Sequence, residues 1–162
     1  MNRAFMKDSD ESAHPEVLPE RPQSPRPNYV TPAGLERLRV QAADLAARLQ
    51  EIGPSADPHE RALLQRDLRW VQGRVQRAIL VDPAAQAPDR VRFGMTVDVR
   101  HEDGGTEALT IVGEDEAEPA TGRISWALPL AEALLGAEPG DEVAWRRPAG
   151  KTRLEIMGVR RP

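Results

Sequence analysis

Apolar residues recur with heptad spacing in two consecutive stretches of this chain, and this pattern constrains the fold more than any other feature. In residues 35–52 and again in residues 64–78, leucine, valine, isoleucine or alanine returns alternately after three and four positions. That spacing places the apolar side chains along one seam of an α-helix, and such a seam is stable only against another helix. Gly53 and Pro54 end the first stretch. We therefore expect two helices of about 21 residues, packed as an antiparallel hairpin roughly 30 Å long.

Both predicted helices have start signals. Thr31 followed by Pro32 is typical of an N-cap and a first helical position, and the segment from Asp57 to Glu60 has the spacing of a capping box. Asp57 and Glu60 also stand one turn apart at the tip of the hairpin. Their carboxylates could therefore supply oxygen ligands to a Mg²⁺ ion whose other ligands belong to a partner macromolecule. The two roles compete for the same lone pairs, and from the residues alone the cap is the simpler interpretation.

Arginines of the second helix gather on the side opposite the seam, if each residue advances the helix by about 100°. These residues are Arg61, Arg66, Arg69, Arg74 and Arg77. A solvated helix face is the simpler interpretation, and a basic strip close to nucleic acid is the alternative. The net charge of −4 argues against general wrapping of nucleic acid, because such binding needs a clustered positive surface.

The rest of the chain divides into a tail and a second domain. Residues 1–28 hold five of the 15 prolines and few large apolar side chains, so we expect a disordered or extended tail. Residues 29–82 form the predicted coiled-coil hairpin. In residues 83–162 the apolar period changes to two, which predicts four or five antiparallel strands around one short helix at residues 129–135. The predicted fold class is α+β: a helical hairpin followed by a small antiparallel-sheet domain.

The sequence contains no self-contained catalytic site. It has no cysteine, and its three histidines are far apart, which argues against a metal site held by this chain alone. It also lacks a phosphate-binding loop and a nucleophile elbow. The acidic residues 114–118 could bind a divalent cation, but an acidic turn is the simpler interpretation. No stretch is long and apolar enough to span a membrane, and the N-terminus lacks the apolar region of a signal peptide. We therefore expect a soluble, cytoplasmic protein.

Four strings of the second domain are distinctive. They are RFGMTVDVRHEDGG (residues 92–105), IVGEDEA (residues 111–117), GRISWALPLAEALLGAEPGDEV (residues 122–143) and PAG (residues 148–150). In these strings the chain resembles the GreA/GreB family of bacterial transcription elongation factors, as a short-coil, GreB-like member. YVTPAGLERL, at residues 29–38, is similar to the start of the family's first coil helix. The resemblance covers residues 30–160 and implies an FKBP-like fold for the C-terminal domain.

The resemblance implies that the C-terminal domain docks on core RNA polymerase and that the hairpin enters the secondary channel. In the family, acidic tip residues help to hold the second Mg²⁺ of the polymerase active site and stimulate the polymerase's own cleavage of backtracked RNA. The factor is therefore not itself an enzyme and has no cofactor of its own. Asp57, Glu60 and Ala62 match the family's tip motif DxxENAxY. Arg61, Leu63 and Leu64 stand where the family has asparagine, an acidic residue and tyrosine.

The resemblance also assigns a docking segment, which consists of Trp126, Ala127, Leu128, Pro129 and Leu130. Where the family has a polar or acidic residue followed by Ser-Pro, this chain keeps only the proline, so we expect an altered polymerase contact. Near the tip, the basic strip would meet nascent RNA only inside the polymerase complex. We expect the factor to be a monomer. Its hairpin is about eight to ten residues per arm shorter than the family's usual coil, which costs about 12 to 15 Å of reach.

Several functions remain open at this point. A Gre-like factor could stimulate cleavage, or it could only occupy the channel as a competitor or inhibitor. A binding-only adaptor for another partner is a further alternative. A peptidyl-prolyl isomerase is less consistent with the sequence, because its apolar proline pocket would have only three aromatic residues in the C-terminal domain to draw on: Phe93, Trp126 and Trp145.

Overall fold

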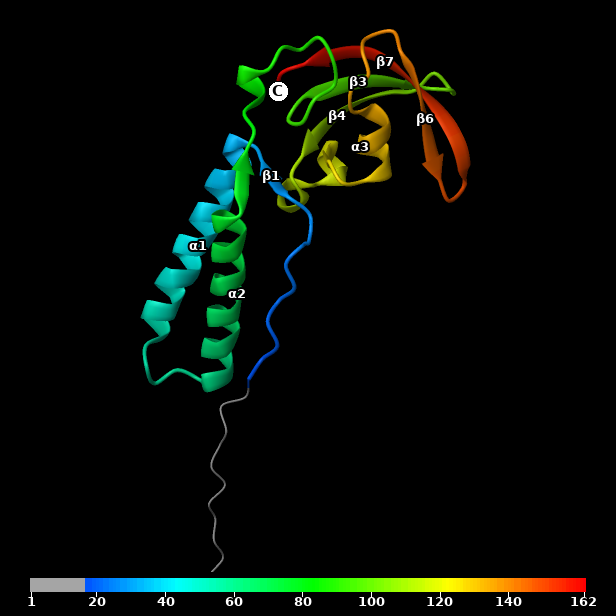
Figure 1. Ribbon diagram of the computed structural model, residues 1–162. Helices are drawn as coiled ribbons and strands as arrows, with labels where there is room; N and C mark the ends of the chain where they lie inside the picture. Colours follow the sequence, from blue (N-terminus) through cyan, green and yellow to red (C-terminus); the bar gives the residue numbers. More distant parts are fainter. Residues whose placement is uncertain (1–16) are drawn as a thin grey trace, which may run out of the picture.

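The computed structural model describes residues 17–162, and its first two helices form the predicted hairpin (Figure 1). Helix α1 spans Pro32–Ile52 and helix α2 spans Pro58–Gln76. Both N-caps are confirmed: the Thr31 side chain accepts a hydrogen bond from the Gly34 amide, and the Asp57 side chain accepts one from the Glu60 amide. Gly53 ends α1 with a φ of 62°, a left-handed value that glycine adopts without strain.

The heptad seam packs as the sequence predicts. Val30, Leu38 and Val71 form the buried centre of the hairpin. Partly buried side chains extend this cluster on both helices: Leu35, Ala42, Leu45, Trp70 and Val75. Since apolar positions of the two helices pack together in this cluster, the hairpin is stabilised by its own small core.

The second helix ends before the predicted apolar run does. Arg77 caps α2, and the next residues form strand β2 (Ala78–Leu80) rather than another helical turn. Strand β2 pairs in parallel with β1 (Asn28–Val30), which directly precedes α1. Heptad reasoning missed this two-stranded sheet because each strand has only three residues and the pairing joins the two ends of the hairpin.

The C-terminal domain is a five-stranded sheet with strand order β5-β4-β3-β7-β6. Its strands are β3 (Thr96–His101), β4 (Thr106–Val112), β5 (Arg123–Ser125), β6 (Glu142–Arg147) and β7 (Gly150–Arg160). Three single-turn 3₁₀ helices lie at Pro83–Ala85 (η1), Glu114–Glu116 (η2) and Pro119–Thr121 (η3). The α+β class is confirmed, but β5 runs parallel to β4, which corrects the expectation of a wholly antiparallel sheet. The two turns η2 and η3 carry the chain back between these strands, so no hairpin forms there.

Helix α3 (Pro129–Leu134) covers the sheet and closes its core (Figure 1). Its Ala131 and Leu134 are fully buried among the inward side chains of the strands. The alternation of apolar and polar residues in β3 and β4 therefore separates a core face from a solvent face. None of the helices within residues 17–162 combines the length and the hydropathy that a membrane crossing requires.

The segment before β1, which composition predicts to be a disordered or extended tail, is extended over its described residues and binds α2. Residues 17–27 run as an extended strap alongside α2 (Figure 1), while residues 1–16 lie outside the described part of the chain. The indole N–H of Trp70 donates to the Pro22 carbonyl at 3.0 Å, and the Gln23 side-chain amide donates to the Trp70 carbonyl at 2.9 Å. A proline-rich chain leaves its carbonyls free, so it can bind a helix without apolar side chains of its own.

Candidate functional site

The tip of the hairpin carries the two predicted carboxylates. Asp57, the N-cap, and Glu60, in the first turn of α2, are both exposed, and the Asp57 Oδ2 atom accepts a hydrogen bond from the Glu60 amide at 3.1 Å. Within residues 17–162, only this half of the capping box forms. One Asp57 oxygen is thus committed to the helix start, while the Glu60 carboxylate complements the helix dipole. The structure brings the pair together and gives both a structural role.

Arg61, a member of the predicted basic strip, is paired within the protein. Its guanidinium donates to the Gly53 carbonyl, across the turn that joins the helices. Gly53 ends α1, so Arg61 ties the end of one arm to the start of the other. The substitution of Arg61 for the polar residue of the family motif therefore adds a brace to the turn.

Two further members of the predicted basic strip are also paired. Arg66 contacts the Asp67 carboxylate at 3.2 Å, and Arg69 holds the Glu20 carboxylate of the strap, with a shortest contact of 2.6 Å. Hydrogen bonding from Arg69, together with its charge, keeps the pKa of Glu20 below its ordinary value. The strap thus neutralises part of the basic strip and lies over that side of α2.

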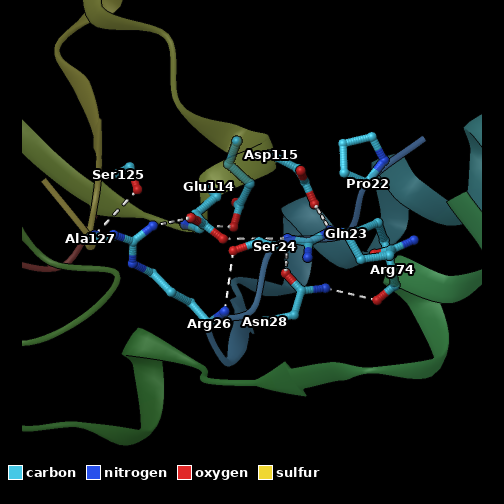
Figure 2. A network of polar contacts seen from close by, with 12 residues as sticks. Pro22, Gln23, Ser24, Arg26, Asn28, Arg74, Glu114, Asp115, Ser125 and Ala127 are labelled. Atoms are coloured by element: carbon cyan, nitrogen blue, oxygen red, sulfur yellow. Dashed lines mark hydrogen bonds and ion pairs between the residues drawn. The ribbon is translucent and has the colours of Figure 1, made fainter. Parts of the chain in front are cut away.

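Arg74 corrects the solvated-face interpretation most clearly. Its side chain is only 2% exposed, and it joins three parts of the chain. Nε donates to Asp115 of η2 at 2.6 Å, and Nη2 donates to Asn28 of β1 at 2.6 Å (Figure 2). The Asn28 amide in turn donates to the Arg74 carbonyl at 2.7 Å. This buried arginine links the hairpin to the sheet domain.

The acidic residues 114–118 form a structural turn. Within residues 17–162, no cluster of three or more histidine, aspartate or glutamate side chains has the arrangement of a metal site. Glu116 is 4% exposed, and its Oε2 atom accepts from the amides of Thr31 at 3.0 Å and Gly113 at 3.1 Å. The Thr31 hydroxyl also donates to Glu116. The cluster therefore clamps the start of α1 onto the sheet domain, as an acidic turn.

The docking segment leads from β5 into α3. Leu128 is 45% exposed and Pro129 is also exposed, so this corner can meet a partner. Ala127 is fixed by a hydrogen bond from its amide to the Ser125 hydroxyl at 3.2 Å (Figure 2). Leu130 points toward the core, where it packs against the buried cluster.

Trp126, the first residue of the docking segment, belongs to the junction between the domains. Its ring packs edge-on against Tyr29 of β1, with 5.0 Å between the ring centroids. The ring of Tyr29 also lies beside that of Phe93, with 6.0 Å between the ring centroids. Sequence reasoning missed Tyr29, Trp70 and the strap as contact residues. An isolated aromatic gives no periodic signal, and their partners lie far away in the chain.

The chain was compared with known families and solved structures. The family model described as "Transcription elongation factor, GreA/GreB, C-term" matches residues 85–161. The GreB protein of Neisseria meningitidis serogroup B is 33% identical over 151 residues, covering 82% of this chain and 93% of that protein. The GreA protein of Alkalilimnicola ehrlichii is 37% identical over 133 residues, covering 78% of this chain and 84% of that protein.

Solved structures of related proteins align over most of the chain, with low overall superposition scores. GreA factor homolog 1 of Thermus thermophilus is 24% identical, covers 83% of this chain and 99% of its own, and has a TM-score of 0.40. A GreA/GreB factor from Nitrosomonas europaea is 28% identical, covers 82% and 98%, and has a TM-score of 0.41. On the sequence relationships, this chain belongs to the GreA/GreB family of transcription elongation factors.

Proposed function

We propose that this protein binds RNA polymerase through its C-terminal domain and regulates elongation by inserting the α1–α2 hairpin into the secondary channel. Family membership supports the partner. The observation that carries the proposal is the fixed junction: Arg74, Glu116 and their partners hold the hairpin at one orientation on the sheet domain. A docked domain would therefore aim the hairpin in one direction, with little entropy left to lose on insertion.

The tip geometry favours occupancy of the channel over direct metal chemistry. Helices of 21 and 19 residues reach about 28 to 32 Å, which is about 12 to 15 Å less than the family's usual coil. A carboxylate must come within about 2.0 to 2.6 Å of a hard cation to bind it, so a shortfall of that size would keep the tip away from the metal. The Asp57 carboxylate already caps α2. We infer a factor that is not itself an enzyme, acts as a cytoplasmic monomer and brings its hairpin to nascent RNA only inside the polymerase complex.

Cleavage stimulation is the second candidate, because both tip carboxylates are exposed. In that case Asp57 and Glu60 would share a Mg²⁺ ion with the polymerase active site, which supplies the remaining ligands. The Asp57 oxygen that does not accept the Glu60 amide is the atom available for this role.

Transcript cleavage in stalled elongation complexes tests the two candidates, with binding to core polymerase measured in parallel by calorimetry. The informative variants are Asp57→Asn, because asparagine caps a helix as well as aspartate does, and Glu60→Gln, with Glu51→Gln on α1 as the exposed control. Occupancy predicts that the protein binds, adds no cleavage, and competes with a cleavage-competent factor equally well in all four forms. Cleavage stimulation predicts activity in the wild type that falls roughly tenfold or more in the two tip variants, equal to about 1.4 kcal/mol of barrier. Absence of polymerase binding by the wild type would refute both.

A further inference from the structure

The hairpin of β6 and β7 ends in a cluster of positive charge that the proposed function does not use. We call Arg146, Arg147, Lys151 and Arg153 the basic tip. Residues 143–154 contain these four cations and no acidic residue, although the whole chain has a net charge of −4. Strand β6 is the last strand of the sheet, and its hairpin lies far from the α1–α2 hairpin (Figure 1).

Strand register places like charges side by side in the basic tip. Arg146 pairs directly with Lys151 across the strands, and Ala144 pairs with Arg153. Directly paired residues share a face of the sheet, so Arg146, Lys151 and Arg153 lie together on the exposed face. All three are exposed. Like charges opposite each other destabilise a strand pair, so this arrangement carries a folding cost.

For the directly opposed pair, Arg146 and Lys151, no ion pair in the described residues offsets that cost. No carboxylate lies within ion-pair distance of Arg146 or Lys151 in residues 17–162, and Arg153 reaches Glu142 only at 4.0 Å. The same sheet supplies acidic partners elsewhere: Arg100 meets Glu155 of β7 at 3.4 Å. The topology therefore permits carboxylates beside basic side chains, but in the described part of the chain Arg146 and Lys151 have none within ion-pair distance.

The remaining cation of the basic tip is held in place by an aromatic ring. Arg147 lies on the opposite face from Arg146, with its guanidinium carbon 4.9 Å from the ring centroid of Trp145. Trp145 itself packs against the buried cluster of the sheet. A guanidinium stacked in this way loses less entropy on binding an anion.

The basic tip lacks the apolar anchors that protein interfaces use. Its turn contains only Pro148 and Ala149, and no large exposed hydrophobic side chain lies between residues 143 and 154. Protein interfaces depend on buried aromatic or aliphatic anchors, whereas contacts to nucleic-acid backbones depend on arginine and lysine. We propose that the basic tip binds the phosphodiester backbone of nucleic acid, without reading its sequence.

Fluorescence anisotropy with a labelled short DNA duplex and a labelled single-stranded RNA, each titrated with the full chain from low to physiological salt, tests this proposal. Each phosphate contact contributes about −0.9 to the slope of log K against log salt for duplex DNA, and about −0.7 for a single strand. Replacement of two tip cations, Arg146→Gln with Lys151→Gln, should therefore flatten the duplex slope by about 2. The matched control is Arg39→Gln with Arg48→Gln, which removes two exposed arginines of α1 and so gives the same net charge as the tip variant.

Stability separates binding from a structural role. Because Arg146 and Lys151 repel each other, the tip variant should melt at the same temperature as the wild type or higher, while it loses binding. Binding to the duplex alone or to the RNA alone identifies the source of the phosphates. An equal loss in the control variant, an unchanged salt slope in the tip variant, or preferential binding of polyglutamate over both nucleic acids would overturn the proposal.

Discussion

Arg74 shows how an arginine can be buried without leaving its charge unpaired. Its guanidinium meets a carboxylate of η2 and an amide oxygen of β1, so its main donors are satisfied by parts of the chain that are distant in sequence. The Glu114 carboxylate lies near as well, at 3.9 Å, and is itself contacted by Arg26 of the strap at 3.5 Å. Arg74 therefore depends on the strap, the hairpin and the sheet domain together.

Arg74→Met should destabilise the protein by about 3 kcal/mol, because removal of one partner leaves a partly buried carboxylate and a buried asparagine unsatisfied. The stability of Arg74→Lys should fall between those of the wild type and Arg74→Met, since a single ammonium cannot reproduce the fork that reaches Asp115 and Asn28. Urea denaturation followed by circular dichroism measures both. The control is Arg77→Met, three residues further on and exposed, which should change stability by less than about 0.5 kcal/mol. Equal effects of the Arg74 and Arg77 substitutions would contradict the role of Arg74 as a link.

Helices and strands with a repeating apolar pattern could be predicted from the sequence. Segments whose structure depends on pairing with residues far away in the chain could not. Both helices, their caps and the strands of the sheet domain follow from spacing and capping residues. The strap and the β1–β2 pair do not, because short or irregular segments carry no period and gain their order from a partner elsewhere. A helical wheel places Arg74 opposite the seam, but it cannot show that another part of the chain covers that face.

The candidate site divides in the same way. The position of Asp57 and Glu60 at the tip follows from the capping pattern, which is local. The pairing of Arg69 with Glu20 depends on a strap that composition alone describes as a tail. A basic strip that looks free in the sequence is therefore partly neutralised in the structure.

The strap should loosen as the solution is acidified. Since Arg69 lowers the pKa of Glu20 in the folded protein, this ion pair stabilises the strap above the ordinary glutamate pKa of about 4.3 and is lost as pH falls through the lowered value. The indole N–H signal of Trp70, which donates to Pro22, reports strap attachment by NMR. We expect the signal to shift toward the solvent-exposed value once the pH falls below the ordinary glutamate pKa. Glu20→Gln should show that shifted value at neutral pH, whereas Glu36→Gln on α1 should follow the wild type; a pH response that survives Glu20→Gln would refute this assignment.

At the scale of the whole molecule, the two domains share a junction instead of a flexible linker. Tyr29 packs on Trp126 of the sheet domain, and Thr31 binds Glu116 with both its amide and its hydroxyl. The Thr31 hydroxyl also caps α1, so one oxygen serves the start of the hairpin and the contact to the sheet domain. Loss of one domain's structure removes contacts that the other needs, which predicts a single cooperative unfolding unit.

Thr31→Val tests this cooperativity, because valine keeps the shape of the side chain and removes the shared hydroxyl. The loss of a helix cap and of a buried hydrogen bond should lower the free energy of unfolding by about 2 to 3 kcal/mol. In a Trp70→Phe/Trp126→Phe background the remaining tryptophan, Trp145, packs against the sheet core, so fluorescence reports the sheet domain. Circular dichroism at the helical band is dominated by the hairpin. Both signals should show one coincident transition, and Thr31→Val should move both by the same amount. Thr106→Val, on the exposed start of β4, serves as the control that leaves both transitions in place. A helical transition that shifts while the fluorescence transition stays fixed would mean that the hairpin unfolds alone and is not held in one orientation for insertion.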